Sequence, residues 1–365
     1  MTPRGFFVLL VVTVALVAAA VYTYPGGPSA GPTAGAKFFP NLGPEALNRV
    51  ASVTVTSGGK SFTVYKKADK WFVKELGDYP AVFDNVKTAL VALSELTPYE
   101  AKTSDKDQLD KLNLEDPSKK GASSKRITLK DKDGKTIADM VIGKSNDNPM
   151  VYGQEMVYVR RPSETQAWLA SGDPKVQDKM LDWASKDVIN ISGERIKELT
   201  IKHADGETIE LAKAKPAGKE FELKNLPDGR EVKDKQILGY IAEVFENNKM
   251  ENVQPAAKLD MAKAKPTVVT MTTFDGVSVT ATLVKEKDTN WVTFKASFDP
   301  AAALKEKPAK DSALKSAEDA KNQVEAINAR LGKWAYEIGS TNARYMQFKL
   351  KDVLKEEKKD DKKDG

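Results

Sequence analysis

The sequence predicts an α+β protein of two tandem antiparallel-sheet units, each with helices packed on one face, behind one N-terminal transmembrane helix. Three observations support this. Strands that alternate apolar and polar residues flank glycine turns, amphipathic helical spacings follow these strands, and the whole order recurs further along the chain. One uncharged apolar segment precedes both units. Antiparallel sheets of this kind bury one face and leave the other in water.

The apolar segment runs from Phe6 to Tyr22 and contains no charged residue. As a helix, its 17 residues would span roughly 26 Å, at the short end of what crosses a bilayer. Arg4 is the only charged side chain before it, so the positive-inside rule predicts a cytoplasmic N-terminus and a body across the membrane. Residues 1–24 are therefore predicted to be a transmembrane anchor, with a signal segment cleaved after Ala20 as the alternative.

Two segments outside the units have compositions that do not favour folding. Residues 25–48 open with a run of Pro and Gly, which cannot hold a helix, so they are predicted to be a flexible tether. Residues 355–365 alternate Lys with Asp and Glu and are predicted to be a charged, disordered tail. The whole chain intersperses 57 basic with 52 acidic residues, so no nucleic-acid partner is expected. Cysteine is absent, so no disulfide stabilises the body.

The first α+β unit is predicted over residues 49–190. Two alternating strands flank a turn at Gly59, and the segment around Trp71 forms a third strand. A second hairpin turns at Gly134. Between the hairpins an amphipathic helix is predicted from apolar residues three and four apart: Val82, Val86, Leu90, Leu93 and Leu96.

The second α+β unit is predicted over residues 191–354 and repeats this order. Its hairpins turn at Gly206 and Gly276, and Trp291 lies in a further strand. The helix between the hairpins is predicted from Ile237, Leu238, Ile241, Val244 and Phe245. Residues 301–331 have no counterpart in the first unit, and their Ala, Lys and Glu content predicts a long exposed helix as an insertion.

The spacing of the turn glycines is the test of repetition. Gly59 and Gly206 differ by 147 in residue number, and Gly134 and Gly276 differ by 142. Two independent landmarks therefore shift by nearly the same amount, which predicts that one unit is used twice. Each unit is also expected to end in a strand and a helix. These endings are Met156–Val159 with a helix around Val176, Met180, Leu181 and Trp183, and Trp334–Ile338 with a helix through Ala343, Met346, Leu350 and Leu354.

These landmarks resemble a bacterial family of unknown function, the domain numbered 4340. The family pattern combines an early Trp strand, a Leu-Gly-Leu step followed by Pro, a hairpin ending in Ile-Gly, and a Tyr-Val-Arg strand. The corresponding residues are Trp71, Leu112-Asn113-Leu114 with Pro117, Leu129 and Gly134 with Ile142-Gly143, and Tyr158-Val159-Arg160. Asn113 replaces the glycine of the second element, and Asn tolerates the left-handed backbone that such a turn requires. The resemblance covers about residues 50–355.

The resemblance implies a bacterial inner-membrane protein with a single span, a cytoplasmic N-terminus and a periplasmic, extracytoplasmic body. Members often look like companions of ABC exporters of the gliding-motility kind. The family has no assigned catalytic residues, so none is carried over to this chain.

Residues that could support catalysis or metal binding are few. His203 is the only histidine, and we expect an exposed turn residue rather than a catalytic base, because triads and most zinc sites need further partners. Asp131, Asp133 and Asp147 could suggest calcium, but a lysine interrupts the first pair and the downstream Glu of a calcium loop is missing. A plain hairpin turn is the preferred explanation, so no metal site is predicted.

Two further groups are interpreted as structural. Arg160 and Arg161 beside Tyr158 could grip an anionic glycan or phosphate, but a solvated strand edge is preferred. The five tryptophans have apolar neighbours and are expected in the core rather than on a ligand platform: Trp71, Trp168, Trp183, Trp291 and Trp334. No catalytic, cofactor-binding or metal-binding residue is predicted, and no cofactor.

The sequence therefore favours a non-enzymatic, membrane-anchored accessory or scaffold protein that docks on a membrane protein such as an ABC exporter. The alternative is a module that binds envelope glycan or another ligand in the cleft between the two units. An envelope hydrolase with clustered buried carboxylates is the remaining, least favoured hypothesis.

Overall fold

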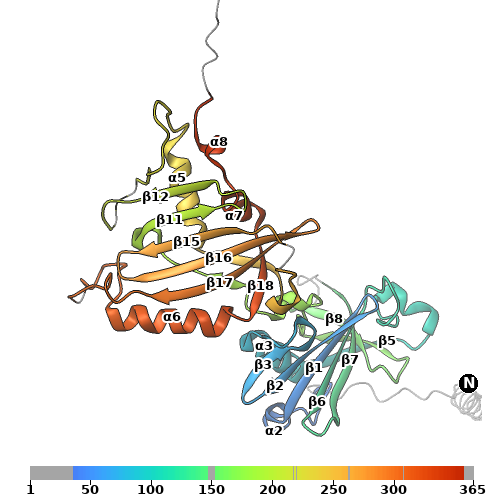
Figure 1. Cartoon of the computed structure of the whole chain (residues 1–365). Coiled ribbons are helices and arrows are strands. Elements are labelled where there is room, and N and C mark those ends of the chain that lie inside the picture. The colour runs from blue at the N-terminus through green and yellow to red at the C-terminus, as the bar shows by residue number, and fades with distance from the viewer. Residues whose placement is uncertain are drawn as a thin grey trace, which may run out of the picture. The chain divides into compact units, whose positions relative to one another are not determined.

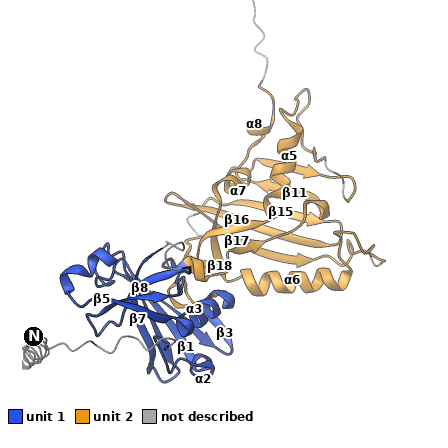
Figure 2. Ribbon diagram, turned by 180° about the vertical axis from the view of Figure 1, so that it is seen from behind, with its two compact units in different colours: residues 1–71, 82–180 blue, residues 72–81, 181–365 orange. Residues whose placement is uncertain are grey.

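The computed structural model describes residues 36–146, 153–216, 218, 220–261, 264–306 and 308–356. The chain divides into two compact units (Figure 2). Unit 1 comprises Met1–Trp71 and Val82–Met180, and unit 2 comprises Phe72–Ala81 and Leu181–Gly365. The predicted apolar anchor at residues 1–24 lies outside the described residues, as do the start of the predicted tether and most of the predicted tail. Among the described residues, no helix combines the length and apolarity needed to cross a bilayer.

The first sheet has nine strands in the order β4-β3-β2-β1-β6-β7-β8-β9-β5 (Figure 1). Most residues of β3 and β4 belong to unit 2 by their contacts. The elements in chain order are α2 (Pro44–Asn48), β1 (Val50–Ser57), β2 (Lys60–Lys67), β3 (Lys70–Val73), β4 (Tyr79–Pro80), α3 (Phe83–Glu95), β5 (Thr97–Thr103), β6 (Lys125–Asp131), β7 (Thr136–Ser145), β8 (Met156–Arg160) and β9 (Ala167–Ser171).

The second sheet also has nine strands, in the order β10-β14-β18-β17-β16-β15-β11-β12-β13. Its elements are β10 (Asp187–Ile189), β11 (Ile196–Lys202), β12 (Thr208–Ala212), β13 (Glu222–Leu223), α5 (Lys235–Ala242), β14 (Asn248–Pro255), β15 (Thr267–Thr273), β16 (Val277–Glu286), β17 (Thr289–Phe298), α6 (Ala317–Leu331), β18 (Trp334–Ile338), α7 (Ser340–Tyr345) and α8 (Leu350–Val353). Short 3-10 turns connect several of them in both units. All the strand pairs with a described register, in both sheets, are antiparallel.

Eight strands of the two sheets follow the same order. Read from β13 to β14, the second sheet has eight strands. Each corresponds to the strand at the same position of the first sheet, read from β3 to β5. The equivalent pairs are β1 and β11, β2 and β12, β3 and β13, β5 and β14, β6 and β15, β7 and β16, β8 and β17, and β9 and β18. The helix after the third strand, α3 or α5, also falls at the same point of the chain order.

Two irregularities in the strand registers fall at equivalent residues of the two sheets, while the further shifts in the pairs β5 with β9, β6 with β7 and β7 with β8 have no counterpart among the described pairs of the second sheet. The pairing of β1 with β6 shifts between Val50 and Ser52, and that of β11 with β15 shifts between Ile196 and Glu198, the matching step. The pairing of β5 with β9 shifts between Pro98 and Glu100, and that of β14 with β18 shifts between Met250 and Asn252. Bulges are preserved features of a sheet rather than random defects. The two shared bulges therefore mean that the two units resemble each other at single residues as well as in strand order.

Apolar periodicity produces the helices that the sequence predicts. In α3 the buried side chains are Val86, Ala89, Leu90 and Leu93, which lie on one face because their spacing matches the helical repeat. In α5 the N-cap Asp234 accepts a hydrogen bond from the Gln236 N–H, while Leu238 and Ile241 are buried. The left-handed turn expected at Asn113 is confirmed, since its φ is 55° and its ψ is 42°.

The insertion of unit 2 differs from its prediction. Residues 301–331 were expected to form a long exposed helix, but α6 begins only at Ala317, and one of its faces is buried through Val324, Ile327 and Leu331. In Figure 1 α6 runs along β17. The Asn328 side chain accepts from the Ala296 N–H at 2.8 Å and donates to the Ala296 carbonyl at 2.9 Å. The helix therefore covers a part of β17 that has no register with β18. Without the helix, this part of β17 would be an open strand edge.

Three other segments differ from their predictions. Residues 36–48, placed in the tether, contain α2 and bury Phe38, Leu42 and Ala46, because these apolar side chains find a surface in unit 1. The helix expected around Val176 is only a 3-10 turn at Met180–Trp183. The strand β9 was not predicted, so β8 was matched with β18, whereas the sheet order matches β8 with β17.

Candidate functional site

A hollow of about 740 Å³ on unit 2 is lined mainly by cationic and polar side chains, and it is called the basic hollow below. Its lining residues are Lys233, Ile237, Lys285, Asn290, Ser340, Arg344, Gln347, Phe348, Lys351 and Asp352. The lining contains four cationic side chains and one carboxylate. Within the described part of the chain, no ion pair neutralises these four cations.

Segments far apart in the sequence form the walls of this hollow. The Lys233 N–H donates to the Val353 carbonyl at 2.8 Å, and the Lys355 N–H donates to the Glu231 carbonyl at 2.9 Å. These backbone bonds hold the entry to α5 against the end of α8. The end of β16 contributes Lys285, and the start of β17 contributes its partner in the register, Asn290.

Aromatic rings adjoin the cations. The Arg344 guanidinium lies 5.8 Å from the ring centroid of Tyr345 and 5.6 Å from that of Phe348. Tyr345 stacks on Tyr240 of α5 with centroids 6.2 Å apart and contacts Phe348 edge-on at 5.2 Å. A guanidinium over aromatic faces is held by cation–π attraction and still exposes donors at its rim.

The turn between β11 and β12 positions Phe348 and the residues after it. His203 Nε2 lies 2.8 Å from the Phe348 carbonyl, and its Nδ1 lies 3.3 Å from the Thr267 hydroxyl. Glu207 accepts the Leu350 N–H at 2.8 Å. The prediction that His203 is an exposed turn residue is therefore wrong: it is 7% exposed, because both ring nitrogens have partners inside unit 2.

Lys349 completes this attachment. Its ammonium pairs with Asp205 and with Glu207, the latter at 3.2 Å. The hydrogen bond from Lys349 lowers the pKa of Asp205, and Asp205 in turn raises the pKa of Lys349. The charged forms therefore stabilise one another around neutral pH, and the backbone beneath the basic hollow is fixed by side chains outside it.

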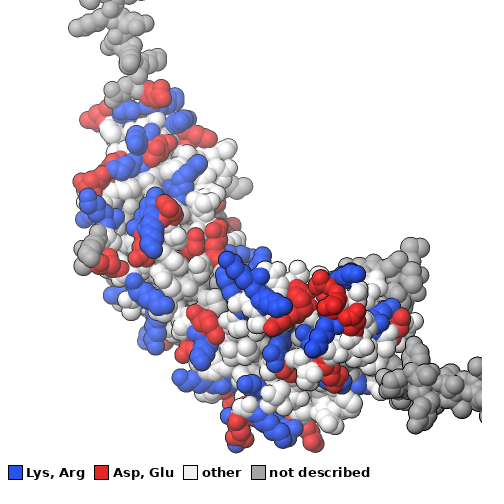
Figure 3. Space-filling view, turned by 90° about the vertical axis from the view of Figure 1, so that its right-hand side faces the viewer, with Lys and Arg blue, Asp and Glu red and all other residues white. Residues whose placement is uncertain are grey.

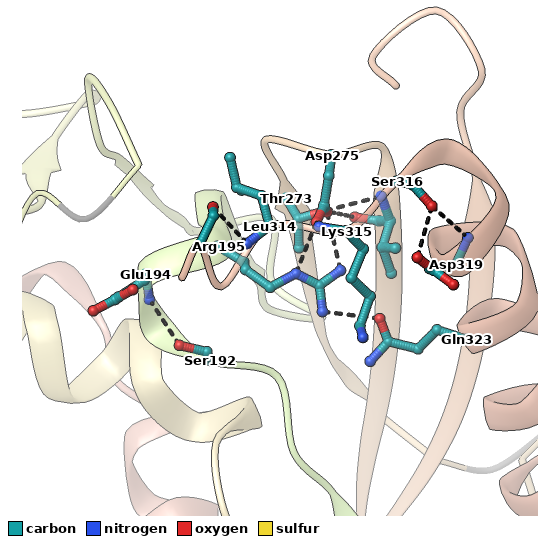
Figure 4. A network of polar contacts seen from close by, with 12 residues as sticks. Ser192, Glu194, Arg195, Thr273, Asp275, Leu314, Lys315, Ser316, Asp319 and Gln323 are labelled. Atoms are coloured by element: carbon teal, nitrogen blue, oxygen red, sulfur yellow. Dashed lines mark hydrogen bonds and ion pairs between the residues drawn. The ribbon is translucent and has the colours of Figure 1, made fainter. Parts of the chain in front are cut away.

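A second polar network lies inside unit 2 (Figure 4). Arg195 forms two hydrogen bonds to Asp275, at 2.9 and 3.0 Å, and the two side chains are 3% and 0% exposed. Thr273 donates to the same carboxylate, and the Lys315 N–H donates to it at 2.7 Å. Arg195 also donates to Gln323 of α6 at 2.8 Å. The network joins the start of β11, the turn between β15 and β16, and the start of the α6 insertion.

The electrostatics of this network indicate a structural role. Burial raises the pKa of Asp275, but hydrogen bonds from Arg195 and Thr273 outweigh it, and the pKa ends below its usual range. The carboxylate is therefore ionised and fully bonded. Because its acceptors are occupied by groups of unit 2, it serves to hold the insertion rather than to exchange protons with a substrate.

The remaining sequence candidates also serve the fold. Asp131 accepts the backbone N–H groups of Asp133 and Lys135, as in a plain hairpin turn, while Asp147 lies outside the described residues. The four hydrogen bonds of Arg160 go to the backbone carbonyls of Leu114, Arg161, Pro162 and Glu164.

Arg160 is buried, so the expectation of a solvated edge is wrong for it. Arg161 donates to the Phe38 carbonyl at 2.9 Å and stacks over the Phe38 ring at 4.7 Å. The tryptophans follow their prediction only in part: Trp71, Trp183 and Trp291 are buried, and Trp168 and Trp334 are half-buried.

Unit 1 has a different hollow, of about 500 Å³, with an apolar floor around Trp71, Phe83 and Leu90. Lys66 at its rim is paired with Asp69 at 2.9 Å. Among the described residues no group of three or more His, Asp or Glu side chains could hold a metal ion. On the face of the molecule that Figure 3 shows, Lys and Arg are mixed with Asp and Glu.

Sequence reasoning missed the basic hollow. Its cations stand at positions 233, 285, 344 and 351, and nothing in their local sequences distinguishes them from other surface lysines and arginines. Only the sheet topology brings these segments together. Chemically, the arrangement suits the binding of an anion with more than one charge, because four cationic side chains line one hollow.

Comparisons with known proteins give one result. The model of a domain of unknown function (DUF4340) matches residues 71–288, more than half of the chain, as a single match that runs through parts of both units. This is shorter than the expected range of about residues 50–355. No curated protein and no solved structure matches the chain.

Proposed function

The chain belongs to the DUF4340 family, and from that premise we propose that it is a non-enzymatic accessory or scaffold protein of the bacterial envelope. The N-terminal apolar segment anchors it in the inner membrane, and the two sheet units lie on the periplasmic side. Its partner is a membrane protein, with an ABC-type exporter as the candidate that the family resemblance suggests.

The proposal includes internal duplication, in which one eight-strand unit was copied and then diverged. The common strand order and the coincident bulges support it. Two sheets of independent origin would rarely have bulges at equivalent residues, because a bulge displaces all the side chains that follow it in the strand.

One observation carries the scaffold proposal: the groups best suited to chemistry are committed to structural bonds. Both nitrogens of His203 have partners within unit 2, Arg160 donates to four backbone carbonyls, and the Asp275 carboxylate is saturated by donors. Side chains used in this way fix the connecting segments at the ends of the sheets, and a docking scaffold needs such fixed connections.

The test is purification of the full chain from its native membranes in mild detergent, after cross-linking and with quantitative mass spectrometry. We expect a stoichiometric multi-span permease together with its ATPase. A chain lacking residues 1–24 is the matched control and should recover less of the same partner. Recovery of the protein alone, or a purified protein that degrades envelope polymers, would overturn the proposal.

A second candidate function is a ligand-binding module of the envelope. The specific observation in its favour is the basic hollow, which lies within unit 2. Ligand binding and docking are compatible, because the hollow uses the connections at one end of the sheet and leaves other surfaces of the protein for a partner.

A further inference from the structure

We propose that the basic hollow of unit 2 binds an anionic carbohydrate, a short run of sugar units that carry carboxylate or phosphate groups. This inference rests on the second candidate function and supplies its ligand class. The exporter-docking proposal is tested separately by purification, so the failure of one leaves the other standing.

Charge is the first reason. Lys233, Lys285, Arg344 and Lys351 line the hollow against one carboxylate, Asp352, and Asp352 already accepts the Lys349 N–H at 2.9 Å. An excess of converging cations attracts a ligand of multiple negative charge, because several charge-assisted hydrogen bonds can form at once.

Size and shape are the second reason. The volume of about 740 Å³ lies within the range of small-molecule sites and far exceeds what one inorganic anion fills. The four cations are exposed around this open hollow, so they can reach a ligand that arrives from solvent. The vesicle measurement in the experiment separates such a ligand from a membrane surface.

The adjoining aromatic group is the third reason. Phe348 lines the hollow, and Tyr345 and Tyr240 continue from it as a stacked pair, with Tyr240 51% exposed. Phe348 itself is buried, so it is the exposed ring of Tyr240 beside the hollow that offers apolar area to the C–H face of a sugar ring. Ser340 and Gln347 in the lining supply polar groups suited to the sugar hydroxyls.

The walls are also held in place before any ligand arrives. The His203 to Glu207 turn holds residues Phe348 to Leu350, and backbone hydrogen bonds join residues 231–233 to 353–355. Fixed walls reduce the ordering cost of binding, so a modest number of polar contacts can suffice.

The experiment uses the purified full chain and isothermal titration calorimetry with three probes: trigalacturonate, glucose 6-phosphate and neutral maltotriose. We expect the anionic sugars to bind and maltotriose not to bind. Arg344→Gln with Lys351→Gln should weaken binding by at least about tenfold, equivalent to the loss of about 1.4 kcal/mol.

The matched control is Lys295→Gln with Lys321→Gln, which removes the same charge from exposed positions of β17 and α6 outside the hollow. It should leave the affinity within about twofold of the parent. A second hollow variant, Lys233→Gln with Lys285→Gln, changes residues outside α7 and α8 and should weaken binding too. If both hollow variants weaken binding, the loss comes from missing contacts with the ligand and not from misfolding of α7 or α8.

Four results would overturn the proposal. The first is no binding of either anionic sugar, and the second is equal weakening in the control variant. The third is inorganic phosphate binding as tightly as glucose 6-phosphate, which would make the sugar irrelevant. The fourth is that the protein binds phosphatidylglycerol vesicles but no sugar, and that the hollow variants abolish this vesicle binding. That result would assign the hollow to the membrane.

Discussion

The first hairpin of unit 1 turns at Gly59, where an added Cβ would meet Lys120 Cα at 3.1 Å, but at Gly206, the matching turn of unit 2, it would meet nothing within 4 Å. The second hairpins show the reverse. A Cβ at Gly134 of unit 1 meets nothing within 4 Å, and at Gly276 of unit 2 it would meet the Asp299 carbonyl oxygen at 2.6 Å. In each unit another segment therefore covers one of the two hairpin turns: the first turn in unit 1 and the second turn in unit 2.

This difference identifies which parts of the two units have diverged. The sheets keep the order of eight strands and two bulges, while the connections beyond the sheet ends pack on different turns. In unit 1 the segment around Lys120 covers the first turn, and in unit 2 the start of the insertion covers the second. Specific sites are therefore expected in the connections, and the basic hollow is formed largely from them.

The largest expected effect comes from the ion pair of Arg195 and Asp275, which is buried inside unit 2. Asp275→Asn leaves the Arg195 charge buried without its partner, which should cost about 3–5 kcal/mol of unfolding free energy. The comparison in unit 1 is Asp139→Asn, which breaks a more exposed pair with Arg126, at side chains that are 23% and 41% exposed. That change should cost no more than about 1 kcal/mol, since water screens the pair.

Chemical denaturation measures both losses, and hydrogen exchange shows which unit opens. The double variant Arg195→Met with Asp275→Leu should recover much of the loss, because it removes both buried charges together. Equal losses in the two single variants would contradict the claimed difference between the units.

The pH dependence of this pair follows from the lowered pKa of Asp275. Its contribution is fully present above the unfolded pKa of an aspartate, about 3.9, and is lost as the pH falls through the lower folded value. Parent and Asp275→Asn should therefore converge in stability below about pH 4. A constant difference down to pH 2 would argue against an ionised carboxylate.

A smaller effect is expected from the four turn glycines, each changed to alanine. All four have a positive φ, between 79° and 92°, so each change should cost about 1–2 kcal/mol from left-handed strain. Gly59→Ala and Gly276→Ala should lose a further ~1–3 kcal/mol, because backbone atoms of the covering segments must move. Thermal unfolding of the four variants measures the pattern, and a larger loss at Gly134 or Gly206 would refute it.

Much of this fold was predictable because hydrophobic alternation and turn glycines are local signals. The hairpins at Gly59, Gly134, Gly206 and Gly276 follow directly from them. The strand β9 was missed because its five residues lack clear alternation, with Ala167, Leu169 and Ala170 all buried. Burial of His203 depends on a segment 145 residues away in sequence, and the basic hollow brings together residues between Lys233 and Asp352. No local pattern reports such contacts.

The third effect concerns the edge of β17, which α6 covers in unit 2. Asn328→Ala removes both hydrogen bonds to Ala296 and should cost about 1–3 kcal/mol, since a backbone donor and acceptor lose their partners. An uncovered strand edge also promotes association between chains. Light scattering at rising concentration should therefore detect self-association in this variant, whereas the exposed neighbour change Lys321→Ala should behave like the parent.

The smallest effect tests a matched pair of side chains at the end of the first strand. Ser57, the last residue of β1, and His203, the residue after β11, lie at equivalent positions. Each bonds a distant carbonyl: that of Ser124 at 3.4 Å and that of Phe348 at 2.8 Å. His203→Ala should cost about 1–2 kcal/mol and Ser57→Ala less than about 1 kcal/mol, because the former leaves a buried carbonyl and the Thr267 hydroxyl unpaired. Phe348 lines the basic hollow, so His203→Ala should also weaken binding of an anionic sugar, while Ser57→Ala should not. Equal affinities in the two variants would mean that the turn stabilises unit 2 without shaping the hollow.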